Sequence, residues 1–154
     1  MVIRNVKQID AEPLAELARK LGQPLDVSRF SQDIAAYAPG FYVAESRDKI
    51  FGYLVMRFEP FPSCVHGKSP VQLWRIFVAP EHQGKGVAAG LMSQAFAYAR
   101  ARAHDVVWLG TSKDNARAIA FYRKSGFNPI AVAELHQGHD SHQDLIMSVS
   151  CNES

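Results

Sequence analysis

The chain has 154 residues, of which 47% are hydrophobic and 21% charged, a composition typical of one globular domain with its own core and unlike that of a disordered chain. The formal net charge of +2 is too small to indicate a nucleic-acid partner, although it mildly favours an anionic ligand. No apolar run is long enough to cross a bilayer, and no signal-peptide core is present, so we expect no membrane association. Cys64 and Cys151 indicate free thiols in a reducing, cytoplasmic compartment.

The first quarter of the chain predicts a strand and two helices. Residues 2–6 alternate weakly between apolar and polar side chains, as a strand does. Asp10 can cap a helix that runs to about Leu21, with apolar side chains spaced along one face. Ser28 can cap a second, shorter helix, which ends before Gly40.

The next segment predicts a hairpin, a loop and a further strand. Residues 41–45 and 50–58 read as strands, and the short polar connection 46–49 predicts that they pair antiparallel. The proline-rich residues 60–70 predict a loop. Residues 73–78 predict a strand, which a proline ends.

The second half of the chain alternates helices and strands. Residues 84–102 predict a long helix, and residues 106–109 a buried strand in a central, parallel position. Residues 115–125 predict another helix, and residues 127–134 and 145–149 two final strands. The predicted order is β-α-α-β-β-β-α-β-α-β-β, an α/β fold with a mixed sheet and helices on its faces. We expect one domain over residues 1–150 and a short tail over residues 151–154.

A glycine-containing turn lies between the strand at 73–78 and the long helix. Helix N-termini carry unsatisfied N–H groups and the positive end of the helix dipole, and Gly84 and Gly86 leave the backbone open to a phosphate. Lys85 adds a positive charge. Two alternatives are an ordinary loop and a dinucleotide-binding turn, because Gly84, Gly86 and Ala89 fit G-x-G-x-x-A.

Gln83, Gly86 and Ala88 fit the pattern [QR]-x-x-G-x-[GA], and this segment resembles motif A of the GNAT superfamily of N-acetyltransferases. The resemblance implies a GNAT-like fold and a site for acetyl-CoA. It implies that the backbone of the turn holds the CoA pyrophosphate and that the strand before it pairs with the pantetheine arm and acetyl group. The implied cofactor residues are Ile76, Phe77, Val78, Gln83, Gly84, Lys85, Gly86, Val87, Ala88 and Ala89.

A second segment, residues 115–127, resembles motif B of the same superfamily, N-x-x-A-x-x-F-Y-x-x-x-G-F, at every fixed position. The resemblance implies that Asn115 hydrogen-bonds the cofactor arm, although asparagine there also suits a helix cap. It implies that Tyr122 is the general acid that protonates the departing CoA thiolate. Without the motif, Tyr122 reads as a core aromatic that shares a helix face with Ile119.

The resemblance implies an acyltransferase that moves the acetyl group of acetyl-CoA to a primary amine. The amine attacks directly in a ternary complex, and no metal takes part. The acceptor is a small molecule or a protein or peptide amine, and family habit favours a homodimer. A non-catalytic acyl-CoA sensor of the same fold is the alternative, because no general base is evident.

In many relatives a glutamate acts as the general base, at the position of Gln72 or at that of Gly110. Neither glutamine nor glycine can take a proton, so both positions lack a base here. Glu45, Glu59 and Glu134 are the remaining candidates, and a water chain is an equal alternative.

The polar segment before the last strand has three open interpretations. His136, His139 and His142 suggest a zinc site by residue type, without a recognised spacing. A solvated hairpin is the simpler alternative. The segment also loosely resembles the PaiA-like branch of polyamine acetyltransferases, with Trp108-Leu109-Gly110 as a second likeness. The positions that carry the first likeness are Gly138, Asp140, Gln143 and Asp144.

Overall fold

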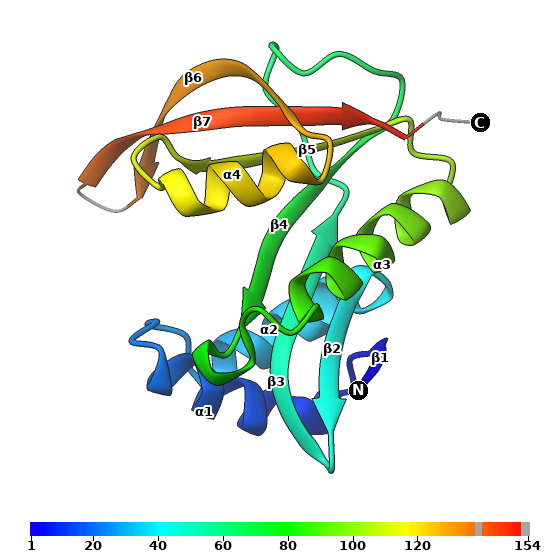
Figure 1. Ribbon diagram of the computed structural model, residues 1–154, viewed down its shortest axis with the longest axis vertical. Helices are drawn as coiled ribbons and strands as arrows, with labels where there is room; N and C mark the ends of the chain where they lie inside the picture. Colours follow the sequence, from blue (N-terminus) through cyan, green and yellow to red (C-terminus); the bar gives the residue numbers. More distant parts are fainter. Residues whose placement is uncertain (138–139, 152–154) are drawn as a thin grey trace. The chain divides into compact units, whose positions relative to one another are not determined.

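The computed structural model describes residues 1–137 and 140–151 (Figure 1). Its helices and strands follow the predicted order, with short 3-10 turns (η) between some of them. The elements are β1 (Val2–Asn5), η1 (Gln8–Asp10), α1 (Ala11–Lys20), α2 (Val27–Tyr37), η2 (Ala38–Gly40), β2 (Phe41–Ser46), β3 (Lys49–Arg57), β4 (Pro70–Val78), η3 (Pro80–His82), α3 (Val87–Ala101), β5 (Val106–Ser112), α4 (Ala116–Lys124), β6 (Asn128–Gln137) and β7 (Asp140–Ser150).

The strands form a seven-stranded sheet in the order β1-β2-β3-β4-β5-β7-β6. Neighbours β1, β2 and β3 pair antiparallel, as do β5, β7 and β6, whereas β4 and β5 pair parallel. The mixed α/β fold class is therefore confirmed. By its contacts the chain divides into two compact units, Met1–Arg57 with Arg75–Ala95, and Phe58–Trp74 with Phe96–Ser154. Each unit is described by itself.

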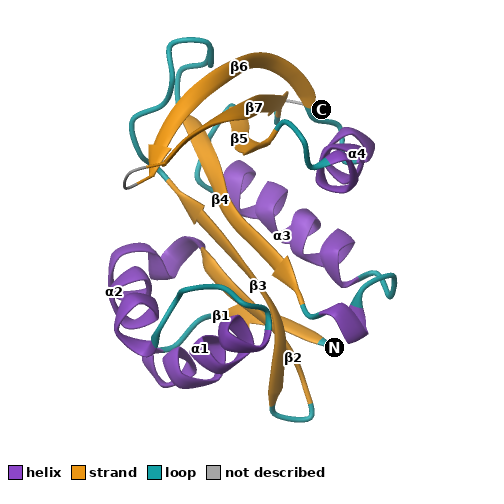
Figure 2. Ribbon diagram, turned by 90° about the vertical axis from the view of Figure 1, so that its left-hand side faces the viewer, coloured by secondary structure: helices purple, strands orange, loops and turns teal. Residues whose placement is uncertain are grey.

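In the first unit, helices cover both faces of the strands (Figure 2). Tyr53 of β3 packs edge-on against Phe30 of α2, with ring centroids 5.7 Å apart. Its neighbour Gly52 faces the other way, because a Cβ there would lie 3.6 Å from Val87 and 3.5 Å from Leu91 of α3. Burial on both faces explains why the middle of β3 is a continuous apolar run without alternation.

In the second unit, the long loop before β4 is fixed by hydrogen bonds to the start of β5. The Asp105 carboxylate accepts the N–H groups of Lys68 and Ser69, at 2.7 and 2.8 Å. The Ser69 hydroxyl lies 3.0 Å from Nδ1 of buried His104. Val65 of the same loop then completes an apolar cluster on the sheet.

One predicted helix cap is wrong, and another is correct in position but not in its hydrogen bond. α2 begins at Val27, and its cap is Asp26, whose Oδ1 accepts the Arg29 N–H at 2.9 Å, so Ser28 lies inside the helix. Asp10 precedes α1 without capping it by a side-chain bond. Its carboxylate instead accepts hydrogen bonds from the Lys7 N–H and from the Arg4 guanidinium. Arg4 lies on β1, and the local sequence does not reveal this contact.

The last two strands are longer than the predicted 127–134 and 145–149. Their ladder continues through the polar segment to the pair formed by Gln137 and Asp140. Main-chain hydrogen bonds hold such a ladder without apolar side chains, and so the hydrophobic pattern underestimates it. Gly138 and His139 lie outside the described residues.

Both cysteines are free, as predicted. Cys151 is buried, and its N–H donates to the Asp105 carbonyl at 3.0 Å. Burial raises the pKa of the Cys151 thiol, which favours the protonated, less nucleophilic form. Among the described helices, none combines the length and the apolar character that a bilayer crossing requires.

Candidate functional site

The predicted phosphate turn lies in the first unit, between the end of β4 and the start of α3. Gly84 and Gly86 have φ angles of +78° and +81°. Because a right-handed helix needs negative φ, both glycines precede α3, which begins at Val87. The helix start predicted at Gly84 is therefore wrong by three residues, and the glycines form the turn itself.

The geometry of the turn suits an anion. A Cβ placed on Gly84 or Gly86 would meet no atom within 4 Å, so the space beside the backbone is open. The first intrahelical bond runs from Gly90 N–H to Gly86 O at 3.0 Å. The N–H groups of the residues between them have no acceptor within the helix, and the helix dipole adds positive potential. The exposed Lys85 can supply a charge at the rim.

Side chains around the turn hold it in place. The Gln83 amide donates to the Val78 carbonyl at 3.2 Å, which ties the turn to the end of β4. The His82 ring stacks on Phe51 of β3 with centroids 4.1 Å apart. Val87 is buried and anchors the first turn of α3. The turn is thus shaped before any ligand binds, which lowers the entropic cost of binding.

The end of β4 is supported by two residues that the sequence analysis did not identify. Tyr53 stacks on Phe77 at 6.1 Å, and burial raises the pKa of Tyr53 to about 12, so its ring packs as a neutral group. Asp33 of α2 accepts from the Arg75 guanidinium at 3.0 Å. The sequence could have indicated Asp33, because this acidic residue lies on the apolar face of α2 with Phe30 and Ile34.

The predicted residues of the second motif belong to the second unit. Asn115 caps α4, because its Oδ1 accepts the Ala118 N–H at 3.1 Å. The cap is confirmed, and the contact with the cofactor arm stays a prediction.

Tyr122 of α4 is half-buried, and its ring lies edge-on to Phe127 with centroids 6.0 Å apart. Burial raises the pKa of Tyr122 above its ordinary value. The hydroxyl therefore keeps its proton at neutral pH, as a general acid must. Packing against the core and acting as an acid are compatible roles for this residue.

Glu45, one of the candidate bases, is poorly suited to take a proton. The Arg4 guanidinium donates to both carboxylate oxygens of Glu45, at 2.8 and 3.1 Å. These hydrogen bonds hold the pKa of Glu45 below its usual range, and so the group is a poor proton acceptor. Glu59 is half-buried in the loop after β3. The side chain of Glu134 lies outside the described residues.

The predicted histidine segment also falls outside the side chains that the structure describes. His139 is among residues 138–139, and the side chains of His136 and His142 are not described. Elsewhere in the described ranges, no group of three or more histidine, cysteine, aspartate or glutamate side chains gathers to hold a metal.

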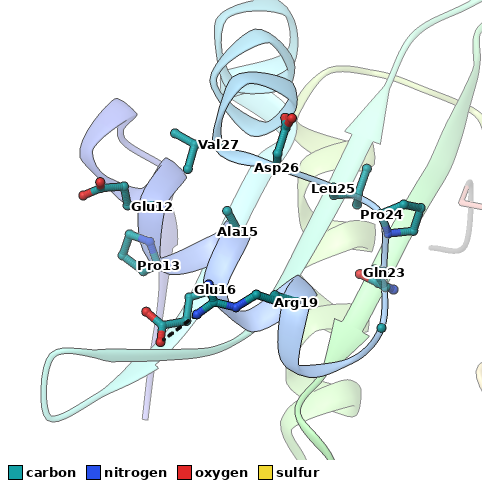
Figure 3. Close-up of a pocket in the computed structure, with 11 residues that line it drawn as sticks. Glu12, Pro13, Ala15, Glu16, Arg19, Gln23, Pro24, Leu25, Asp26 and Val27 are labelled. Carbon is teal, nitrogen blue, oxygen red and sulfur yellow. Dashed lines mark ion pairs between the residues drawn. The ribbon is translucent and has the colours of Figure 1, made fainter.

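A hollow of about 1040 Å³ lies in the first unit, along α1 and the connection to α2 (Figure 3). Glu12, Glu16 and Asp26 line it, together with Arg19, which pairs with Glu16 at 3.5 Å. None of the predicted cofactor or catalytic residues is among the described residues that line it. The hollow is therefore separate from the phosphate turn.

Comparison with known proteins identifies the family. Residues 7–127 match the model of the acetyltransferase (GNAT) family. An uncharacterized N-acetyltransferase of Methanocaldococcus jannaschii is 27% identical over 135 residues, which are 81% of this chain and 59% of that protein. Streptothricin acetyltransferase of Streptomyces lavendulae is 40% identical over 79 residues, 49% of this chain and 42% of that protein. The chain thus covers less than two thirds of the length of either relative.

The fold agrees with a solved structure. That of yncA from Salmonella typhimurium, determined with its cofactor acetyl-CoA, superposes with a TM-score of 0.77 at 20% identity and covers 99% of this chain and 95% of that one. Since the family model spans well over half of the sequence, the resemblance stated from the two motifs is confirmed. The chain belongs to the acetyltransferase (GNAT) family.

Proposed function

We propose that the protein transfers the acetyl group of acetyl-CoA to a primary amine, with both substrates bound at once. The observation that carries the proposal is the turn at Gly84 to Gly86, where two positive φ angles and open space precede the N-terminus of α3. Helix starts of this kind bind phosphate groups, and the pyrophosphate of CoA supplies such groups. The acetyl-CoA found in the Salmonella relative supports the same cofactor here. Family membership removes the dinucleotide-binding alternative.

The reaction depends mainly on how the protein positions the amine and the thioester. The backbone N–H groups of Phe77 and Val78 polarise the thioester carbonyl, as an oxyanion hole does. The amine attacks the carbonyl carbon directly, and no covalent enzyme intermediate forms. Tyr122 donates its proton to the leaving CoA thiolate. Holding amine and thioester together supplies a large part of the rate enhancement.

The acceptor is a small-molecule or peptide amine. The streptothricin acetyltransferase relative acts on a small molecule by its name, which supports the first class. A polyamine acceptor, as in the PaiA-like branch, remains a prediction. Neutral Gln72 and Trp74 stand where that branch has acidic residues, which weakens attraction for a polycation. A homodimer and a cytoplasmic location also remain predictions.

An acceptor screen with free-thiol detection tests the proposal. Polyamines, amino acids, aminoglycosides and peptide N-termini are each added to the protein with acetyl-CoA. We expect at least one class to release CoA well above the rate of hydrolysis. If acetyl-CoA binds and no amine accelerates thiol release, the chain is an acyl-CoA sensor and the proposal is wrong.

A further inference from the structure

β3 has a β-bulge at Phe51, next to the end of β4. The register between β2 and β3 shifts between Ala44 and Glu45, and Phe51 is the extra residue that this shift leaves in β3. The Phe51 carbonyl accepts a hydrogen bond from the Ala79 N–H at 2.7 Å, which attaches the bulge to the residue that follows β4. Bulges re-aim the chain locally, and they are common next to active sites.

Gly52, the residue after the bulge, leaves room for the backbone of β4. A Cβ on Gly52 would lie 2.9 Å from the carbonyl oxygen of Phe77, which is closer than such atoms approach in folded proteins. On the side of α3 the same Cβ would meet Leu91 at 3.5 Å and Val87 at 3.6 Å, which are ordinary contacts. A side chain at position 52 would therefore have to displace the Phe77 carbonyl.

The Phe77 carbonyl belongs to the same peptide group as the Val78 N–H. Because a peptide group is planar and trans, these two groups move together and point in opposite directions. The space left by Gly52 therefore sets the direction of the Val78 N–H, one of the two donors in the proposed polarisation of the thioester. Such a donor is effective only within about 3 Å of the developing negative charge, so a small rotation of the peptide group weakens it.

Tyr53, the residue after Gly52, supports Phe77 from the other face of the sheet. Its ring stacks on the Phe77 ring, with centroids 6.1 Å apart and an angle of 17° between the planes. Tyr53 is only 1% exposed, and the rings of Phe30 and Phe41 hold it at centroid distances of 5.7 and 5.9 Å. Closely packed rings have little freedom to move, so β3 fixes the side chain of Phe77 as well as its carbonyl.

We propose that Gly52 and Tyr53 are positioning residues for acetyl transfer. Together they hold the Phe77–Val78 peptide group so that its N–H points at the thioester oxygen, and they act on the reaction through that group. The inference rests on the proposed acetyl transfer and adds the part of the fold that places the donor. A misplacement of about 1 Å can lower an enzyme's rate about 100-fold, so such residues have a measurable effect.

Replacing Gly52 by alanine tests the inference. Gly52→Ala should lower kcat at least about tenfold for an amine found in the acceptor screen, because the new methyl group displaces the Phe77 carbonyl. Its dissociation constant for CoA, measured by calorimetric titration, should stay within about threefold of wild type, because the glycine turn before α3 is unchanged. A loss confined to kcat is what a misplaced transition-state donor predicts.

Gly40→Ala is the matched control. Gly40 precedes β2, and a Cβ there would come too close to the carbonyl oxygen of Met56, near the other end of β3. Met56 lies about 13 Å from Gly52 along the strand. Gly40→Ala should lower the temperature of thermal unfolding at least as much as Gly52→Ala does, and it should keep kcat within about twofold of wild type.

A second substitution separates position from stability. Leu91→Val shortens the α3 side chain that the new methyl group meets, so alanine at position 52 can shift toward α3 and release the Phe77 carbonyl. In the Gly52→Ala background, Leu91→Val should raise kcat at least about threefold, although it removes a buried methylene group and lowers thermal stability. A purely structural role for Gly52 predicts a further loss, since two destabilising substitutions would add.

Tyr53 provides an independent test if Gly52→Ala does not fold, as judged by its thermal transition. Tyr53→Leu removes the ring that stacks on Phe77, and it should lower kcat at least about fivefold. Tyr53→Phe keeps that ring and should hold kcat within about twofold of wild type.

Each variant has a result that overturns the inference. For Gly52→Ala it is a kcat within about twofold of wild type, or a loss of kcat that Gly40→Ala matches. For the Leu91→Val double variant it is a further fall in kcat, and for Tyr53→Leu it is the wild-type kcat. Failure of the proposed function looks different, because the wild-type protein would then bind acetyl-CoA and acetylate no amine.

Discussion

Replacing Gly86 by alanine tests whether the turn before α3 is the phosphate site. Gly86 has a φ of +81°, and a Cβ there would meet no neighbouring atom. The substitution therefore introduces backbone strain without a clash. The left-handed conformation costs a residue with a Cβ about 1–2 kcal/mol. In a domain of this size that lowers the melting temperature by roughly 2–8 °C.

We expect the substitution to reduce the affinity for acetyl-CoA more than the stability of the fold. If the chain relieves the strain by turning away from positive φ, the N–H groups of the turn no longer point at the phosphate. Loss of one hydrogen bond to a charged group costs about 1.5–3 kcal/mol, or roughly 10- to 100-fold in affinity. Gly86→Glu adds a like charge, worth about 4 kcal/mol at 4 Å under an effective dielectric constant of about 20. We expect it to abolish detectable binding.

Gly22→Ala is the matched control. Gly22 follows α1 with a φ of +71°, and a Cβ there also meets nothing within 4 Å. Both alanine variants should lose similar stability in thermal unfolding. In calorimetric titration with acetyl-CoA, only Gly86→Ala should bind more weakly. Wild-type affinity in both Gly86→Ala and Gly86→Glu would refute the assignment of the phosphate site.

Two further predictions concern titratable groups. Tyr122→Phe should lower kcat about 100-fold while acetyl-CoA affinity, measured by titration, stays within about twofold; an unchanged rate would remove the acid role. Hydrogen bonds from the Lys68 and Ser69 N–H groups hold the pKa of Asp105 below its usual range, so its stabilisation is present above the unfolded value of about 3.9 and lost as pH falls through the lower folded value. The urea midpoints of wild type and Asp105→Asn should therefore differ at pH 7 and begin to converge as the pH falls below about 4. A difference that stays constant with pH would contradict this.

Predictions that depend on a few neighbouring residues agree best with the structure. The connection at 46–49 is a tight turn, with Arg47 and Asp48 at positive φ, and it joins an antiparallel pair as expected. Asn115 caps α4, and Gly126 follows the helix at φ +105°. The errors arise where equivalent local signals compete, as when Asp26 and not Ser28 caps α2.

The sequence by itself determined the order of elements and the place of the glycine turn before α3, because these depend on periodicity and on residues close together in the chain. It indicated the family through the resemblance of two motifs, which the family model confirms. Only the tertiary structure decided which charged and aromatic groups meet. The Arg75 guanidinium donates to Asp33, and the Arg4 guanidinium donates to Glu45. The Asp144 carboxylate lies beside the space that a side chain at Gly110 would occupy. Such contacts join residues far apart in sequence, and they follow from strand register and helix packing, which no local pattern encodes.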